Sequence, residues 1–171
     1  MTIPLAEQRH ERATGSTAGL SSVGVWIPVG SLLFIMALAG SAAAVPELRR
    51  LHSFQALIYV AVIVYSRRGN GLAFGAGTTV AIAWNALNLF VTHLMQAGAR
   101  EAWVFLRTAQ THRLDTMLVF IGGVSHFVLI AACLTGFIAL NPDARAWRRF
   151  ALGGLIGMLY MAAIIAAFRP R

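Results

Sequence analysis

The third long apolar run of the sequence carries an unusual number of polar side chains. Asn85, Asn88 and Thr92 follow one another at helical spacing, and Thr78 precedes them by about two turns. At about 100° per residue these four side chains share one face of an α-helix. An amide inside hydrocarbon needs hydrogen-bond partners, so this face is predicted to turn towards other helices or a cavity. Two interpretations stay open: hydrogen bonding between helices, and the lining of a path for a small molecule or an ion.

The opposite face of the same helix is apolar, and we predict that it faces lipid. Its residues are Val80, Ala83, Leu87, Phe90, Val91 and Leu94. A helix with one polar and one apolar side is typical of a position between a bundle interior and its surroundings.

Histidine side chains gather towards one end of the predicted helices. Neutral imidazole ligates haem iron or another metal, and it also passes protons. The candidates are His52, His93, His112 and His126. His93 and His126 could hold one haem b only if helix tilt absorbs a depth difference of about 6 Å. Haem b or a quinone is one hypothesis, and hydrogen bonds between helices or contacts with headgroups are the other; no particular metal is indicated.

The sequence offers no catalytic constellation. It contains no H-x-x-x-H, H-E-x-x-H, G-x-S-x-G or P-loop motif. It also contains no Lys, which excludes a lysine Schiff base and a lysine nucleophile. A non-enzymatic role is therefore favoured.

Composition indicates a membrane protein. Of the 171 residues, 58% are hydrophobic and 12% are charged, against about 45–50% and about 25% in soluble domains. The formal charge is +8, but the arginines stand in small groups beside apolar runs instead of forming one basic face. They are typical of headgroup contacts and not of a nucleic-acid surface.

Five apolar runs predict an all-α bundle of five transmembrane helices. We expect them at about 23–45, 47–66, 71–97, 116–140 and 147–168. Residues 1–22 are polar with no sustained helical or strand period, and they are predicted to form a flexible or surface-lying tail. Gly98 is predicted to stop the third helix, and residues 99–112, with Trp103, are predicted to form an amphipathic helix at the membrane interface. A solvated loop is the alternative for residues 99–112.

Glycines at helical spacing predict close packing between helices. Gly71 and Gly75, and again Gly153 and Gly157, have G-x-x-x-G spacing, which lets two backbones approach each other. Gly122 lies on the same helix face as His126, and this face is predicted to point inward.

Arginine counts do not orient the protein, because five spans leave equal numbers at the two ends. At the end that holds the N-terminus are Arg9, Arg12, Arg67, Arg68, Arg145, Arg148 and Arg149; at the other are Arg49, Arg50, Arg100, Arg107, Arg113, Arg169 and Arg171. Insertion in both orientations is therefore an alternative. We predict an integral protein of the bacterial inner membrane.

The predicted function is that of a non-catalytic subunit or assembly partner in a larger membrane complex. Its expected partners are lipid and either other membrane subunits or a second copy of the chain, with no nucleic acid. The alternative is a carrier of electrons or a small solute, in which haem b, a quinone or an ion uses the polar face of the third helix and the histidines.

Overall fold

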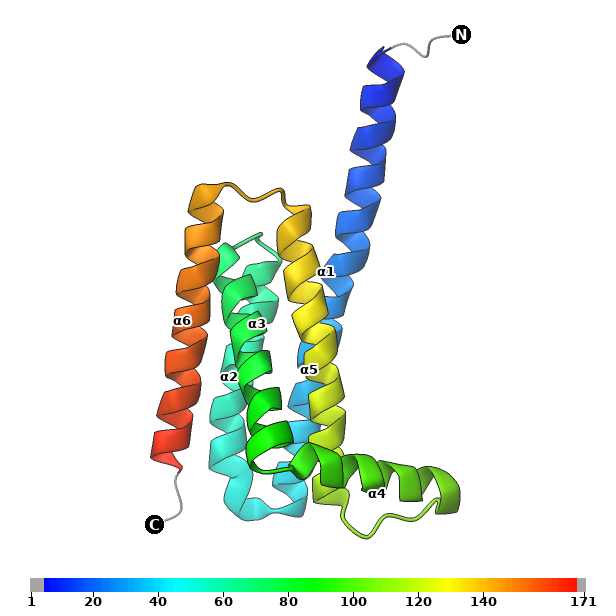
Figure 1. Ribbon diagram of the computed structural model, residues 1–171, viewed down its shortest axis with the longest axis vertical. Coiled ribbons are helices and arrows are strands. Elements are labelled where there is room, and N and C mark those ends of the chain that lie inside the picture. The colour runs from blue at the N-terminus through cyan, green and yellow to red at the C-terminus, as the bar shows by residue number, and fades with distance from the viewer. Residues whose placement is uncertain (1–4, 169–171) are drawn as a thin grey trace.

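A computed structural model describes residues 5–168, with side-chain surroundings from residue 24 onwards. Every regular element in this range is helical. The elements are α1 (Leu5–Ala44), the 3-10 turn η1 (Pro46–Leu48), α2 (Arg49–Ser66), α3 (Gly71–Ala86), the π-helical turn η2 (Leu87–Val91), α4 (Leu94–Thr108), α5 (Leu114–Ala139) and α6 (Ala144–Ala167). Five of these helices run alternately up and down, whereas α4 runs sideways across one end of the bundle (Figure 1). We call this end the α4 end.

Four of the helices are long and apolar enough to cross a membrane. They are Gly24–Ala44, Gly71–Val91, Leu114–Ala139 and Ala144–Ala167. The chain is therefore an all-α protein with the architecture of an integral membrane protein. Helix α2 is not among the four, and its first turn begins with Arg49, Arg50 and His52 within the sequence RRLH.

Helix α1 is longer than the sequence predicted. Residues 1–22 were expected to form a flexible or surface-lying polar tail, and the structure continues α1 back through this segment to Leu5, beyond the bundle (Figure 1); residues 1–4 lie outside the described range. Residues 5–13, LAEQRHERA, are mostly strong helix formers. They continue an existing helix, so they do not have to form a new helical nucleus.

Side-chain caps fix the beginnings of α3 and α6. The Asn70 side chain accepts a hydrogen bond from the Leu72 backbone N–H at 3.1 Å. The Asp143 carboxylate accepts one from the Ala146 N–H at 2.7 Å. Because Asp143 acts as the N-cap, α6 begins at Ala144, three residues before the predicted start of its span at 147.

The third helix breaks well before residue 97, where the sequence predicted its end. The α-helix ends at Ala86, a π turn follows, and His93 then takes a left-handed conformation with φ 56°. The Asn88 side-chain Nδ2 donates to the Trp84 carbonyl at 2.9 Å, which an α-helix would pair with the Asn88 backbone N–H. The Thr92 N–H instead reaches back to the Leu87 carbonyl, five residues earlier.

Gly98 does not stop a helix, contrary to the prediction. It lies inside α4, which spans Leu94–Thr108 instead of 99–112. A Cβ at Gly98 would meet the Thr116 carbonyl oxygen and the Phe120 side chain. The residue therefore serves the close approach of α4 to α5 and not the termination of the preceding helix.

The face of α3 that was predicted to meet lipid is partly covered by protein. Val80 is only 1% exposed, and α6 packs along α3 with Gly157 beside Val80. Exposed apolar side chains on this face are found at its end, at Phe90 and Val91. In sequence, an apolar helix face that meets another helix looks the same as one that meets lipid, so the pattern could not reveal this contact.

Candidate functional site

The polar residues of α3 lie in three different surroundings. Thr78 is buried in the half of the helix away from the α4 end, and its Oγ1 has no hydrogen-bond partner among the described residues. Asn85 is also buried, and its Nδ2 donates to the Gly123 carbonyl of α5 at 3.2 Å. This bond joins two helices, so it agrees with the first of the two interpretations of the polar face. The Asn85 Oδ1 is buried without a partner in the described structure.

Asn88 and Thr92 occupy the third of these surroundings, just beyond the end of α3. The Thr92 hydroxyl donates to the Asn88 Oδ1 at 3.2 Å. Asn88 is buried, whereas Thr92 is exposed, because the chain leaves the bundle at this point. Both residues line a cavity. This part of the polar face therefore lines a cavity, and the second interpretation, the lining of a path for a small molecule or an ion, stays a prediction.

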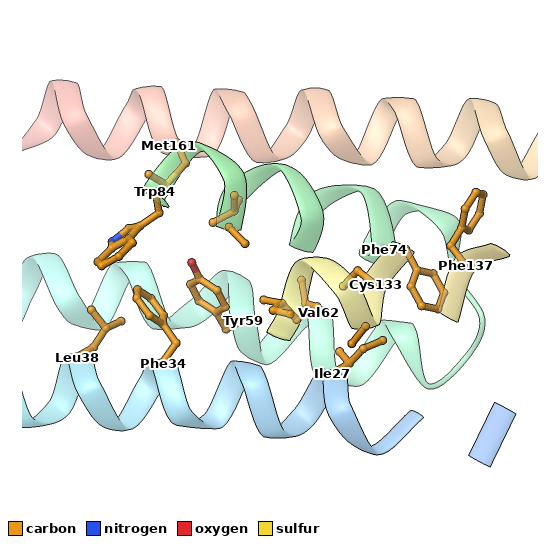
Figure 2. Packing of buried hydrophobic residues seen from close by; sticks show 14 of the residues in the cluster. Ile27, Phe34, Leu38, Tyr59, Val62, Phe74, Trp84, Cys133, Phe137 and Met161 are labelled. Carbon is orange, nitrogen blue, oxygen red and sulfur yellow. The ribbon is translucent and has the colours of Figure 1, made fainter. Parts of the chain in front are cut away.

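This cavity lies at the α4 end of the bundle and has a volume of about 490 Å³. All six α-helices contribute to its lining. Most of its wall is apolar, and the large side chains in the wall include Phe34, Leu38, Trp84 and Met161. Figure 2 shows Phe34 and Leu38 from α1 on one side and Trp84 with Met161 on the other. The rings of Phe34 and Trp84 meet edge to face with centroids 5.2 Å apart.

Polar side chains line the same cavity near the ends of the helices. His52 Nδ1 lies 3.1 Å from the Leu38 carbonyl oxygen. A carbonyl only accepts, so Nδ1 carries the proton, and the Nε2 of a neutral imidazole is then an acceptor. Thr116 is 1% exposed, and its Oγ1 has no hydrogen-bond partner in the described part of the chain. Gln55 and Asp115 complete the polar lining on α2 and α5.

His126 lies behind the aromatic wall of the cavity and is fully buried. A hydrogen bond of 2.7 Å joins its Nε2 to the Tyr59 hydroxyl. The ring packs against Phe34, with centroids 4.0 Å apart, and against Trp84 at 4.8 Å. Gly122 makes room for this cluster, because a Cβ there would stand 3.2 Å from two carbons of the Phe34 ring.

The histidines predicted to act together lie in separate places. His93 is exposed at the break between α3 and α4, and His112 is exposed in the link before α5, where its backbone N–H donates to Glu101. Only His52 lines the cavity among the histidines of the described residues. Ligation of iron by His126 Nε2 would have to break its bond to Tyr59. From residue 24 to 168, no group of three or more His, Cys, Asp or Glu side chains could hold a metal ion.

The glycines singled out from their spacing pack one helix of this chain against another. Gly75 and Gly153 lie at the α3–α6 contact, where a Cβ on Gly75 would meet the Phe150 carbonyl and one on Gly153 the Leu72 carbonyl. Gly71 and Gly157 belong to the same contact. The two G-x-x-x-G motifs thus face each other.

Sequence reasoning missed several residues of the site. Phe34, Trp84 and Thr116 line the cavity, yet nothing in their local spacing distinguishes them from ordinary residues of an apolar helix. Tyr59 offered one signal, since a hydroxyl in the middle of an apolar run needs a hydrogen-bond partner. Its partner, 67 residues away, could not be read from the pattern.

Comparisons of the chain with protein-family models, with curated proteins and with solved structures find no match.

Proposed function

We propose that this chain is a five-span integral membrane protein that binds a small, largely apolar molecule in the cavity at the α4 end. The cavity itself is the observation that carries the proposal: about 490 Å³, with aromatic walls and several polar side chains. Pockets for small molecules commonly measure about 300–1,000 Å³ and combine apolar walls with a few polar groups. The proposed binding role differs from the predicted carrier of electrons or a small solute, which used haem b, a quinone or an ion, but it keeps Asn88, Thr92 and His52 from the residues selected for that role, since all three line the cavity.

The packing of α2 supports its role as the fifth span. The helix contacts α1 and α3, and Tyr59 and Val62 are buried in these contacts. On the other side, Leu57, Val60 and Val64 are exposed and apolar, as lipid-facing side chains are. The arginines of its first turn then lie at headgroup depth, where long cationic side chains reach water.

The composition of α4 supports a position at the membrane interface. Trp103 and Leu106 are exposed apolar side chains. The guanidinium carbon of Arg107 lies 4.4 Å from the centre of the Trp103 ring. Exposed aromatic and cationic side chains on one helix, lying across the end of a bundle (Figure 1), are typical of headgroup depth.

A role as accessory subunit of a larger complex stays a prediction. The G-x-x-x-G glycines, which partly motivated it, are used in the α3–α6 contact inside this chain. Exposed side chains on α6 such as Leu155 and Leu159 suit either lipid or a partner helix. Stoichiometric companion chains after extraction in mild detergent would favour this role, and a lone monomer would contradict it.

We further propose the bacterial inner membrane as the location, with recovery in the inner-membrane fraction as its test.

A filled cavity tests the proposed binding. Ala37 lines the cavity and is 6% exposed, so we expect Ala37→Phe to occupy the ligand's space. Ala163→Phe is the matched control, because Ala163 is exposed on α6. The full chain is purified in mild detergent, and bound small molecules are identified by solvent extraction and mass spectrometry. Leu118→Phe, which fills the cavity from α5, serves if Ala37→Phe does not fold.

We expect one molecular species to be enriched over the surrounding lipid in the wild type and in the Ala163→Phe control. It should be lost from the filled variant. A wild-type protein that carries only bulk lipid, or a filled variant that keeps the same species, would contradict the binding function.

A further inference from the structure

We infer that the ligand of the cavity is a neutral amphiphile with a hydroxyl head, which enters head outward towards the α4 end. This inference rests on the proposed binding function and names its ligand class. Three features of the lining carry it: how polarity changes with depth, which charges are present, and which hydrogen-bonding groups are free.

Polarity in the cavity decreases with depth. His52, Asp115 and Thr116 lie within the first turn or so of α2 and α5, at the α4 end. Phe34 and Trp84 lie about 6–9 Å deeper, judged from the helical rise, because His52 is level with Leu38, four residues from Phe34, and Gly122, six residues beyond Thr116, is level with both rings. A molecule with one polar end and an apolar body matches this gradient when its head lies at the α4 end.

The charges of the lining favour a neutral head. Asp115 is the ionised side chain among the described lining residues, and no arginine of residues 24–168 lines the cavity. The Asp115 carboxylate repels an anionic head. Asp115 already has a cationic partner, because Arg113 lies 3.5 Å away in a surface ion pair, so a cationic head would compete with that guanidinium.

The free hydrogen-bonding groups favour a hydroxyl over a carbonyl or an ether. His52 donates through Nδ1 to the Leu38 carbonyl, which leaves Nε2 as an acceptor that can take a donor from the ligand. Thr116 Oγ1 is buried without a partner and can both donate and accept. A buried hydroxyl without a partner costs free energy that a ligand head can recover. A hydroxyl supplies both functions, whereas an ether only accepts.

Trp84 provides a probe of occupancy, because it stands in the cavity wall. The full chain is placed in phosphatidylcholine nanodiscs, and a set of probes with the same brominated twelve-carbon tail is added: dodecanol, dodecyl methyl ether, dodecanoate and dodecyltrimethylammonium. Bromine quenches tryptophan fluorescence at short range. The Trp84→Phe variant gives the background from the other tryptophans and from probe dissolved in lipid. An alkaline buffer keeps the dodecanoate head ionised.

We expect saturable, Trp84-dependent quenching by dodecanol at a concentration at least about tenfold lower than that needed for the ether or for either charged probe. Thr116→Val, which keeps the shape and removes the hydroxyl, should weaken dodecanol about fivefold. Thr135→Val on the same helix should change nothing, because the Thr135 hydroxyl is exposed and bonds within α5.

Three outcomes separate the two levels of the proposal. Equal or tighter binding of dodecanoate or dodecyltrimethylammonium overturns the neutral class but leaves the binding function intact. Equal binding of the ether and of dodecanol overturns the hydroxyl requirement. If no probe gives saturable quenching that depends on Trp84, the binding function itself fails.

Discussion

The Nε2 atom of His126 lies 2.7 Å from the hydroxyl oxygen of Tyr59, and both side chains are almost completely buried. One hydrogen bond therefore joins α2 to α5 in the interior of the bundle. It connects the helix that is least apolar among the proposed spans with the helix that packs most extensively on α1.

Loss of the tyrosine hydroxyl should weaken this link. In Tyr59→Phe the buried imidazole of His126 loses the hydrogen bond to the tyrosine hydroxyl, and we expect the free energy of unfolding to fall by about 1–3 kcal/mol. Unfolding of the purified protein in SDS, followed by circular dichroism, measures the change. Tyr65→Phe is the control on the same helix, because Tyr65 is 47% exposed.

The double variant Tyr59→Phe with His126→Phe makes the test stricter. When both polar partners become apolar, no unpaired group remains, so the double variant should be more stable than the sum of the two single losses predicts. Simple additivity would show that the hydrogen bond contributes little.

The α3–α6 contact should be sensitive to a single methyl group. In Gly153→Ala the new Cβ meets the Leu72 carbonyl, and we expect a loss of about 1–3 kcal/mol in the free energy of unfolding. Gly24→Ala is the control, because a Cβ at Gly24 meets no atom within 4 Å. If the two variants unfold at the same SDS concentration, the helices α3 and α6 do not approach each other closely at Gly153.

Labelling from one side of the membrane tests whether α2 spans it. Single cysteines replace Glu47 and Arg68, exposed residues at the two ends of α2, in a background in which Cys133 is Ala. In sealed vesicles, an impermeant maleimide should label only one of the two positions. Labelling of both positions to the same partial extent would instead indicate insertion in both orientations, which the equal arginine counts allow. Full labelling of both would exclude α2 as a span.

The docking of α4 should depend on Gly98. A side chain there meets the Thr116 carbonyl oxygen and Phe120, so Gly98→Leu should detach α4 from α5. We expect faster hydrogen exchange across Leu94–Thr108. Arg100→Leu is the control, since Arg100 is exposed on the same helix. Unchanged exchange in Gly98→Leu would show that the contact does not hold α4 in place.

The coarse fold could be predicted because hydrocarbon imposes a simple rule on sequence. Apolar runs of about twenty residues, separated by Arg, Gly and Pro, are sufficient to indicate an all-α membrane protein. The four helices that meet this criterion coincide with four of the predicted spans to within a few residues at most ends. The large exception is the third, where the α-helix gives way to a π turn at the residues that include Asn88, whose side chain bonds to the Trp84 carbonyl. Spacing alone showed the polar residue but not its local backbone partner.

The candidate site was predictable only in part, because it is built by contacts between distant segments. Asn88 was selected as part of the polar face, His52 was selected because its imidazole can bind a cofactor or pass a proton, and both line the cavity. His93 was selected for the same reason, yet the chain turns at this residue and leaves it exposed. Phe34 and Thr116 acquire their role from what faces them across the bundle, and hydropathy periodicity carries no information about such pairings.

The lining of the cavity comes from every helix of the bundle, on both sides of the turn at Gly69. A gene divided at this turn would therefore give two fragments, each with part of the wall and neither with the whole cavity. Only the two fragments together would form the complete cavity. Binding of the ligand would therefore report whether two separately inserted fragments have associated in the bilayer.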